Sequence, residues 1–400
     1  MKRQFLGVAI GLAALAFGGA FGATAQAQSA TALERSGNVF HKAACSHVVA
    51  PGEAYCHAHV VTDPAGNEKE GKNGTAAPNV TPSGLSPANL KAAYKVAGTG
   101  TGTIAIVDAY GYPNAEADLN TYRAQYGLGP CTSANGCFLK VDQNGGTSYP
   151  RNNTGWAQEQ ALDIDMASAM CPTCKILLVQ SNSATLANLA AAVNTAANLG
   201  AIVISNSYGG GEAGSSAYVS AYNKPNIAVT VSSGDSGYGV QFPASAPGAI
   251  AVGGTHLVVA SGTRGWAETA WNGAGSGCSA IYGKPVFQTD SLCGNRTEAD
   301  ISAVADPATG VAVYGPTGTG TKSGWLVFGG TSVAAPLVGG IYAAYNIHPQ
   351  AAAGIWTNHG VGLNDVTVGS NGTCGTSLCN AGVGYDGPTG WGTPNGSTGL

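Results

Sequence analysis

A serine in a glycine-rich stretch and two helical carboxylates are the residues of this chain best suited to chemistry. Ser332 lies in the stretch GGTSVAAP, residues 329–336, and Glu159 and Asp163 stand four residues apart in a predicted helix. This spacing places both carboxylates on one helix face. A serine hydroxyl is a weak nucleophile until a neighbouring base removes its proton. The pattern indicates nucleophilic catalysis with Glu159 as base and Asp163 as its orienting group, without an imidazole.

The surroundings of Ser332 distinguish it from two other copies of the same Gly-Thr-Ser triplet, at 146–148 and 375–377. Only the copy with Ser332 leads directly into a long apolar helix, and Pro336 falls in its first turns, where proline is tolerated. We expect the Ser332 side chain to be exposed at the helix start, where the positive end of the helix favours a developing negative charge. A serine that only caps the helix is the alternative.

The two carboxylates have no structural reason to be neighbours, because like charges at this spacing repel each other. A catalytic site can use a shared proton to hold one of them ready as a base. Asp165, two residues beyond Asp163, is expected to point away from the pair. An ordinary solvated helix face is the alternative interpretation of the pair.

Asp235 is the third candidate, because it follows a predicted buried strand and is flanked by Gly234 and Gly237. A protonated carboxyl group can donate a hydrogen bond to an oxyanion, which a carboxylate cannot do. This role favours acidic conditions. An aspartate in an ordinary turn is the alternative.

Apolar, β-branched runs alternate with helical patterns through most of the chain. The predicted buried strands are 103–107, 175–180, 201–205, 227–232 and 249–253, and further predicted helices are 186–199 and 333–345. This alternation predicts an α/β fold with a mostly parallel central sheet that is flanked by helices on both faces.

The N-terminal residues predict export. Lys2 and Arg3 precede an apolar stretch, and small residues follow it, so residues 1–27 are predicted to be a signal peptide cleaved after Ala27. A membrane anchor is the alternative. Residues 28–83 are predicted to be a short prosegment or N-terminal extension with a polar linker, and residues 84–400 a single catalytic domain.

Charge and cysteine content support an exported protein. The formal net charge is −4 and only 10% of residues are charged, so neither nucleic acid nor an anionic membrane is an expected partner. Ten cysteines form close sequence pairs, which predict five local disulfides. The predicted pairs are Cys45–Cys56, Cys131–Cys137, Cys171–Cys174, Cys278–Cys293 and Cys374–Cys379. Zinc binding or redox activity at 171–174 is the alternative, but no second CxxC motif accompanies this pair.

The three candidate elements, in this order, resemble the sedolisins, which are serine-carboxyl peptidases with a subtilisin-like fold. The resemblance runs from about residue 84 to 396 and implies that Glu159 is the base, Asp163 its orienting group, Asp235 the oxyanion residue and Ser332 the nucleophile. Other stretches that resemble family landmarks are 84–90, 205–209 (beside the substrate cleft), 251–255, 300–303 and 306–310.

The same resemblance implies one structural Ca²⁺ site near the C-terminus. Its ligands would be the side chains of Asp365 and Asp386, the carbonyl oxygens of Val366, Gly382 and Gly384, and a water molecule. Carboxylate and carbonyl oxygens suit this hard cation.

The expected function is that of a secreted, monomeric, acid-active endopeptidase that cleaves protein or peptide substrates through an acyl-enzyme. One alternative is a subtilisin-type protease that uses Asp108, at the end of the first predicted strand, with a histidine. No histidine lies between Asp108 and Asp235, where that enzyme type would need one. Another alternative is a non-catalytic secreted protein that keeps a peptidase fold.

Overall fold

The computed structural model covers most of the chain beyond the predicted signal peptide. The described residues are Met1, 32–47, 49–68, 82–318, 322–348 and 352–400. The predicted signal peptide therefore lies outside the described residues apart from Met1. Residues 31–400 form one compact unit. Among the described residues, no helix has the length and apolar character needed to cross a membrane.

An eight-stranded sheet forms the centre of this unit. Its strand order is β12 (Trp266–Ala270), β11 (Ile250–Val259), β10 (Ala228–Ser232), β8 (Val203–Asn206), β5 (Thr103–Ala109), β7 (Lys175–Ser181) and β6 (Phe138–Asp142), with β15 (Ile301–Val304) paired to β11. Every pairing is parallel except that of β11 with β12. The predicted α/β fold and the five predicted strands are confirmed, with ends shifted by a few residues.

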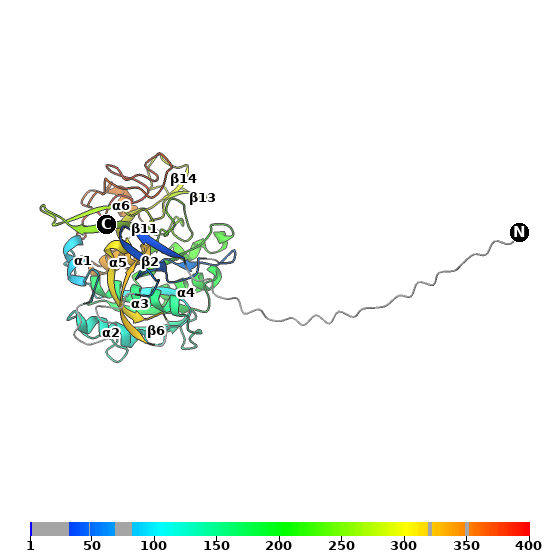
Figure 1. The fold of residues 1–400 in the computed structure, drawn as a ribbon, viewed down its shortest axis with the longest axis vertical. Helices are drawn as coiled ribbons and strands as arrows, with labels where there is room; N and C mark the ends of the chain where they lie inside the picture. Colours follow the sequence, from blue (N-terminus) through cyan, green and yellow to red (C-terminus); the bar gives the residue numbers. More distant parts are fainter. Residues whose placement is uncertain (2–31, 48, 69–81, 319–321, 349–351) are drawn as a thin grey trace. The chain divides into compact units, whose positions relative to one another are not determined.

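Helices cover both faces of this sheet. The helices α3 (Thr154–Met170) and α5 (Thr331–Ala344) pack on one face, and α4 (Leu186–Asn198) packs on the other. The other helices are α1 (Pro87–Tyr94), α2 (Ala115–Gln125) and α6 (Ala353–Thr357). In β5, Ile104 and Ile106 pack in the core that contains α3 and α5, whereas Ala105 and Val107 pack in the core that contains α4. This alternation explains why the strand is apolar at every position. In Figure 1, α3 and α5 lie near the centre of the coloured ribbon, with α2 and β6 toward its lower edge.

A second sheet joins the N-terminal segment to the strands that precede α5. Its order is β1 (Leu33–Ser36), β2 (Val39–Ala43), β4 (His59–Thr62), β17 (Ser323–Gly329) and β16 (Val311–Pro316). Two smaller ribbons pair β3 (Tyr55–Cys56) with β9 (Tyr208–Gly209), and β13 (Gly277–Gly283) with β14 (Asn295–Glu298). Short 3₁₀ helices lie at Ser215–Ala217, Val219–Tyr222 and Pro307–Thr309. Strands β1 to β4, called the N-terminal segment here, therefore share sheets with the body of the protein.

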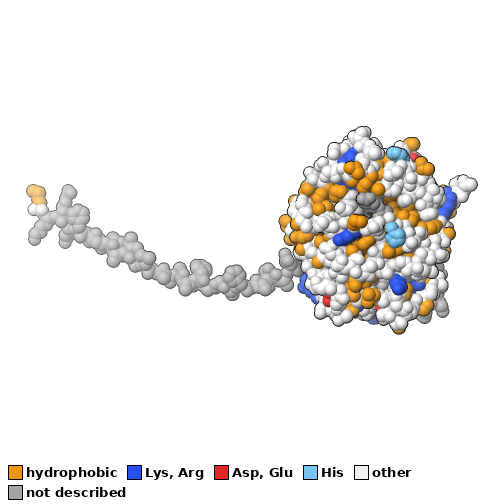
Figure 2. Space-filling model, turned by 180° about the vertical axis from the view of Figure 1, so that it is seen from behind, with side chains coloured by type: hydrophobic (Ala, Val, Ile, Leu, Met, Phe, Trp, Pro, Cys, Tyr) orange, Lys and Arg blue, Asp and Glu red, His pale blue; other side chains and the backbone are white. Residues whose placement is uncertain are grey.

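All five predicted disulfides are confirmed. Cys171–Cys174 follows the end of α3 and closes a short turn, so this CxxC motif is a structural crosslink in the folded chain. The surface is poor in charge, and the face shown in Figure 2 displays mostly uncharged and hydrophobic atoms with very few Asp or Glu side chains.

Candidate active site

Ser332 lies in the first turn of α5, two residues after a glycine that allows a very close backbone contact. Gly330 has a φ of +98°, and a Cβ atom there would clash with the His57 carbonyl oxygen and lie 2.6 Å from Asp235 Oδ2. Only glycine satisfies both constraints. The prediction that Ser332 would be exposed is wrong, because its relative exposure is 0% in this structure. The N-terminal segment lies beside this helix start, because the His57 carbonyl oxygen is packed against Gly330.

The Ser332 hydroxyl is engaged by a carboxylate. Its Oγ donates a hydrogen bond to Glu159 Oε2 at 2.9 Å, and the Ser207 carbonyl oxygen lies 3.3 Å away. The structure therefore brings together the serine and the carboxylate that the sequence singled out, although 173 positions separate them. Among the described residues, no histidine is hydrogen-bonded to Ser332.

Three carboxyl groups form one buried cluster beside this serine. Glu159 and Asp163 lie on α3, and Asp108 lies near the end of β5; all three are fully buried. Burial and the charge of Asp163 raise the pKa of Asp108 well above its usual value. Burial, with the charges of Asp163 and Asp108, does the same to the pKa of Glu159, while the Ser332 hydrogen bond opposes the shift. A cluster of this kind holds protons that isolated carboxyl groups would lose.

Asp163 lies near the Ser207 hydroxyl and near Glu159. Burial raises its pKa well above the usual value, while contacts with the Ser207 hydroxyl and with Glu159 act in the opposite direction. Because these groups are coupled, their protons are shared by the cluster as a whole. Asp165 accepts a hydrogen bond from the Tyr314 backbone N–H at 3.0 Å, which fixes α3 against β16. It is buried and is not part of a solvated helix face.

Asp235 contacts the start of α5 through Thr331, the residue before Ser332. Its Oδ1 accepts hydrogen bonds from the Thr331 backbone N–H at 2.8 Å and from the Thr331 hydroxyl at 2.6 Å. Its Oδ2 lies 3.4 Å from His59 Nε2. Burial raises the pKa of Asp235 to about 8, against the opposing effect of the Thr331 hydrogen bonds. The carboxyl group is therefore suited to carry a proton beside the serine in acid.

The N-terminal segment runs across this site as an added strand. β3 pairs antiparallel with β9, and the His57 N–H donates to the Ser207 carbonyl oxygen at 3.2 Å. Two residues later β4 pairs antiparallel with β17, where His59 lies opposite Gly329. The Ser207 carbonyl oxygen, which receives the His57 N–H, is the same atom that lies 3.3 Å from Ser332 Oγ. The His57 carbonyl therefore lies next to the start of α5.

The side chain of His57 fills a polar recess. Its Nδ1 is 2.7 Å from Ser232 Oγ, and its Nε2 is 2.9 Å from Gln241 Oε1. Gln241 in turn donates to the Tyr55 hydroxyl at 2.7 Å. Burial lowers the pKa of His57 to about 3 and that of His41 to about 4, so these imidazoles are neutral. Sequence reasoning did not assign a role to these residues; the spacing of four histidines within residues 41–59 was the available signal.

Asp365 and Asp386, the two carboxylates predicted to bind Ca²⁺, lie near enough for the charge of Asp365 to help raise the pKa of Asp386. The Gly384 N–H donates to Asp365 Oδ2 at 2.9 Å, and the Gly382 N–H donates to Asp386 Oδ2 at 2.9 Å. Asp386 is buried and its Oδ1 also accepts from Thr389. In the described part of the chain, neither carboxylate forms an ion pair with Lys or Arg. This oxygen-rich set fits a hard cation.

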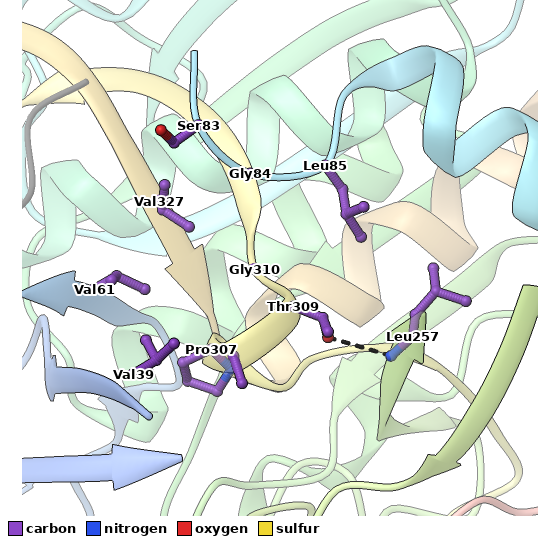
Figure 3. A pocket seen from close by; sticks show the side chains of 11 residues that line it. Val39, Val61, Ser83, Gly84, Leu85, Leu257, Pro307, Thr309, Gly310 and Val327 are labelled. Atoms are coloured by element: carbon purple, nitrogen blue, oxygen red, sulfur yellow. Dashed lines mark hydrogen bonds between the residues drawn. The ribbon is translucent and has the colours of Figure 1, made fainter. Parts of the chain in front are cut away.

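A separate cavity of about 510 Å³ lies between the N-terminal segment and the body. Val39 and Val61 line it from the N-terminal strands, and Val327, Pro307 and Leu257 line it from the body (Figure 3). None of the four candidate catalytic residues is among the described residues that line this cavity.

Comparison with known proteins agrees with this geometry. The sequence model of the subtilase family matches residues 114–370, more than half of the chain. Kumamolisin from Bacillus sp. (strain MN-32) is 29% identical over 375 residues, which cover 82% of this chain and 65% of that relative. The solved structure of Pseudomonas sedolisin, a serine-carboxyl proteinase, superposes with a TM-score of 0.68 at 26% identity and covers 80% of this chain and 100% of its own. This chain belongs to the sedolisin family, within the subtilases.

Another sedolisin relative shows the same relationship over a shorter region. Sedolisin from Pseudomonas sp. (strain 101) is 34% identical over 200 residues, which cover 41% of this chain and 32% of that relative. This sedolisin-family chain therefore spans less than two thirds of the length of these curated relatives. The family prediction and the subtilisin-like fold are confirmed.

Proposed function

We propose that this chain is a secreted, acid-active serine-carboxyl endopeptidase. The observation that carries the proposal is the 2.9 Å hydrogen bond from Ser332 Oγ to Glu159 Oε2. A base within hydrogen-bond distance of the nucleophile is the first geometric requirement for this chemistry. The subtilisin-type alternative has less support, because His256, the histidine that follows β10 in sequence, is bound to Asp306 at 2.8 Å.

The first half of the reaction forms an acyl-enzyme. Ser332 Oγ attacks the carbonyl carbon of the peptide bond while Glu159 takes the hydroxyl proton. Protonated Asp235, together with the positive end of α5, stabilises the oxyanion. When the C–N bond breaks, Glu159 gives its proton to the leaving amine. The substrate acyl group remains on Ser332 as an ester.

The second half reverses these roles. Glu159 takes a proton from a water molecule, whose oxygen adds to the ester carbon. Collapse of the second tetrahedral intermediate breaks the bond to Ser332 Oγ, which recovers a proton from Glu159. Asp163 positions Glu159 throughout and shares its charge.

The carboxyl cluster limits the proposed activity at both ends of the pH range. Glu159 must be deprotonated to act as the base, while the other members of the cluster keep the remaining protons. The raised pKa values mean that Glu159, Asp163 and Asp108 retain shared protons to a higher pH than free carboxyl groups do. As the pH rises through these values, further negative charges must enter one buried cluster, which is unfavourable. We therefore expect activity to fall as neutral pH is approached.

The N-terminal segment is proposed to act as a prosegment. We propose that the His57–Ala58 peptide bond is the one presented to Ser332. Two contacts support this: the His57 carbonyl is packed against Gly330, and the His57 N–H donates to the Ser207 carbonyl oxygen. Addition of a strand to an exposed edge is a general way to bind an extended peptide. A free substrate has to displace this segment.

One Ca²⁺ ion is proposed to be held by the carboxylates of Asp365 and Asp386 and the carbonyl oxygens of Val366, Gly382 and Gly384. This ion would neutralise the buried Asp386 and link two C-terminal loops. Its role would be structural, because this site does not include the candidate catalytic residues.

Secretion is proposed from two features. The N-terminal sequence is typical of an export signal, and five disulfides form in the folded chain. Disulfides of this number are characteristic of oxidising compartments.

The test is hydrolysis of a denatured protein by the purified chain from about pH 2 to about pH 8, with Ser332→Ala as the matched variant. We expect cleavage in acid that falls by roughly 10⁵-fold to 10⁶-fold in the variant. Equal rates for the two proteins would refute the proposal.

A further inference from the structure

Three side chains from three neighbouring strands meet beside Asp235. Glu34 on β1 is the direct cross-strand partner of His41 on β2. His41 lies opposite Val61 on β4, so His59, two residues before Val61, lies diagonally from His41 on the same face. The sheet thus brings one carboxylate and two imidazoles together without any contribution from the candidate catalytic helices.

The donor atoms of these side chains have the spacing of metal ligands. His41 Nδ1 and His59 Nδ1 are 3.0 Å apart. Glu34 Oε2 lies 3.9 Å from the first and 3.8 Å from the second. Two donors at about 2.0–2.1 Å from one tetrahedral Zn²⁺ ion lie about 3.3 Å apart. The observed distances fall on both sides of this value, so small side-chain rotations would bring all three atoms into coordination distance.

The surroundings also match a metal site. His41 and His59 are buried, at 3% and 1% exposure, whereas the Glu34 side chain is 45% exposed. The second ring nitrogen of His59, Nε2, faces Asp235 Oδ2 at 3.4 Å. Neither atom has a hydrogen-bond partner in the described part of the chain, and a metal-bound histidine usually directs its other N–H at a nearby carboxylate, which fixes the ring orientation.

Space and charge are available for an ion. A cavity of about 200 Å³ is lined by Glu34, His41, Asp235 and Trp271, so a water molecule can supply a fourth ligand. Arg35 also lines this cavity, but its guanidinium group donates to the Gly37 carbonyl and to Asn38 and forms no ion pair with Glu34. Within the described ranges, no Lys or Arg forms an ion pair with Glu34, and its negative charge is therefore available to a cation.

We propose that Glu34, His41 and His59 bind one divalent transition-metal ion, with Zn²⁺ as the best match to the ligand set. Two imidazoles and one carboxylate with an open fourth position are typical zinc ligands. Ca²⁺ fits poorly, since it requires six to eight oxygen ligands. This site is separate from the C-terminal site proposed for Ca²⁺.

A metal ion at this site would keep the N-terminal segment attached after cleavage. This consequence rests on the proposed function, in which that segment is a prosegment. Glu34 and His41 precede the His57–Ala58 bond, whereas His59 follows it. A bound ion would therefore join the two sides of this bond and hold β1 and β2 in place even after cleavage.

The test measures Zn²⁺ binding to the full-length, tag-free Ser332→Ala protein by calorimetry at neutral pH, with Ca²⁺ present throughout. The Ser332→Ala change prevents self-digestion. We expect one equivalent of Zn²⁺ to bind, and Co²⁺ to give the intense visible absorption of a tetrahedral site. Glu34→Gln, at a partly exposed position, should weaken Zn²⁺ binding at least about 10-fold, and His59→Ala should abolish it.

The matched control is His348→Ala, because His348 is an exposed histidine outside the cluster. Binding to this variant should equal that of the Ser332→Ala parent. No binding to the parent, or equal binding to the parent and to Glu34→Gln, would overturn the site. Either result leaves the proposed peptidase activity untouched, whereas an inactive wild type would refute that activity without affecting the zinc measurement.

Discussion

The two sides of Ser332 are built in different ways. On one side, Glu159, Asp163 and Asp108 are carried by a long helix and a central strand and are fully buried in the core. On the other side, residues 55–59 are held largely by strand pairing with β9 and β17 and by the disulfide Cys45–Cys56. The comparison teaches that the groups proposed to do chemistry belong to the central helix and sheet, whereas residues 56–59, although equally buried, come from an added segment that pairs with strands β9 and β17.

Substitutions in the buried carboxyl cluster beside Ser332 should have the largest effect on kcat. We expect Asp163→Asn to lower kcat by roughly 10³-fold to 10⁴-fold, because a neutral amide cannot share the charge of Glu159. Asp165→Asn is the matched control on the same helix, since Asp165 binds the Tyr314 backbone and not the serine. Steady-state kinetics in acid distinguish the two, and equal losses of kcat would contradict the assigned roles.

The oxyanion role of Asp235 predicts a smaller effect. Asp235→Ala should lower kcat by roughly 10²-fold to 10³-fold through loss of one donor. Asp235→Asn should retain more activity, because its amide donates a hydrogen bond at any pH. A change in KM alone, measured over the acid range, would argue against this role.

Cleavage of the N-terminal segment is the next prediction. Protein incubated in acid should acquire a new N-terminus at Ala58, determined by N-terminal sequencing. Ala58→Pro should delay the appearance of activity, because proline at this position hinders attack on the preceding carbonyl. Ser332→Ala protein provides the uncleaved reference. A new terminus elsewhere in residues 28–83 would show that the segment covers the site without being cut at His57.

Calcium removal should have the smallest effect, on stability. A chelator is expected to lower the midpoint of thermal unfolding by roughly 5 °C relative to Ca²⁺ at about 100 times its Kd. Asp386→Asn protein should respond much less. Equal shifts in both proteins would place the ion elsewhere.

The carboxylate side could be predicted from the sequence because its signals are local. Glu159 and Asp163 share a face through helix periodicity, and the strand that carries Asp108 is a continuous apolar run. The burial of Ser332 could not be predicted in this way. It depends on the pairing of Tyr55 and Cys56 with β9, a contact between distant segments that leaves no local pattern. The contact between His41 and His59 also depends on strand register, because β2 and β4 must pair in the observed alignment.

The central claim is that a carboxylate, and not an imidazole, serves Ser332. The most direct measurement compares kcat/KM of the wild type, Glu159→Gln and His256→Ala from about pH 2 to about pH 8. We predict that Glu159→Gln loses roughly 10⁴-fold or more, that His256→Ala stays close to the wild type, and that the wild-type rate falls as the carboxyl cluster loses its protons. An active Glu159→Gln variant, or a wild-type optimum at neutral pH, would contradict the account.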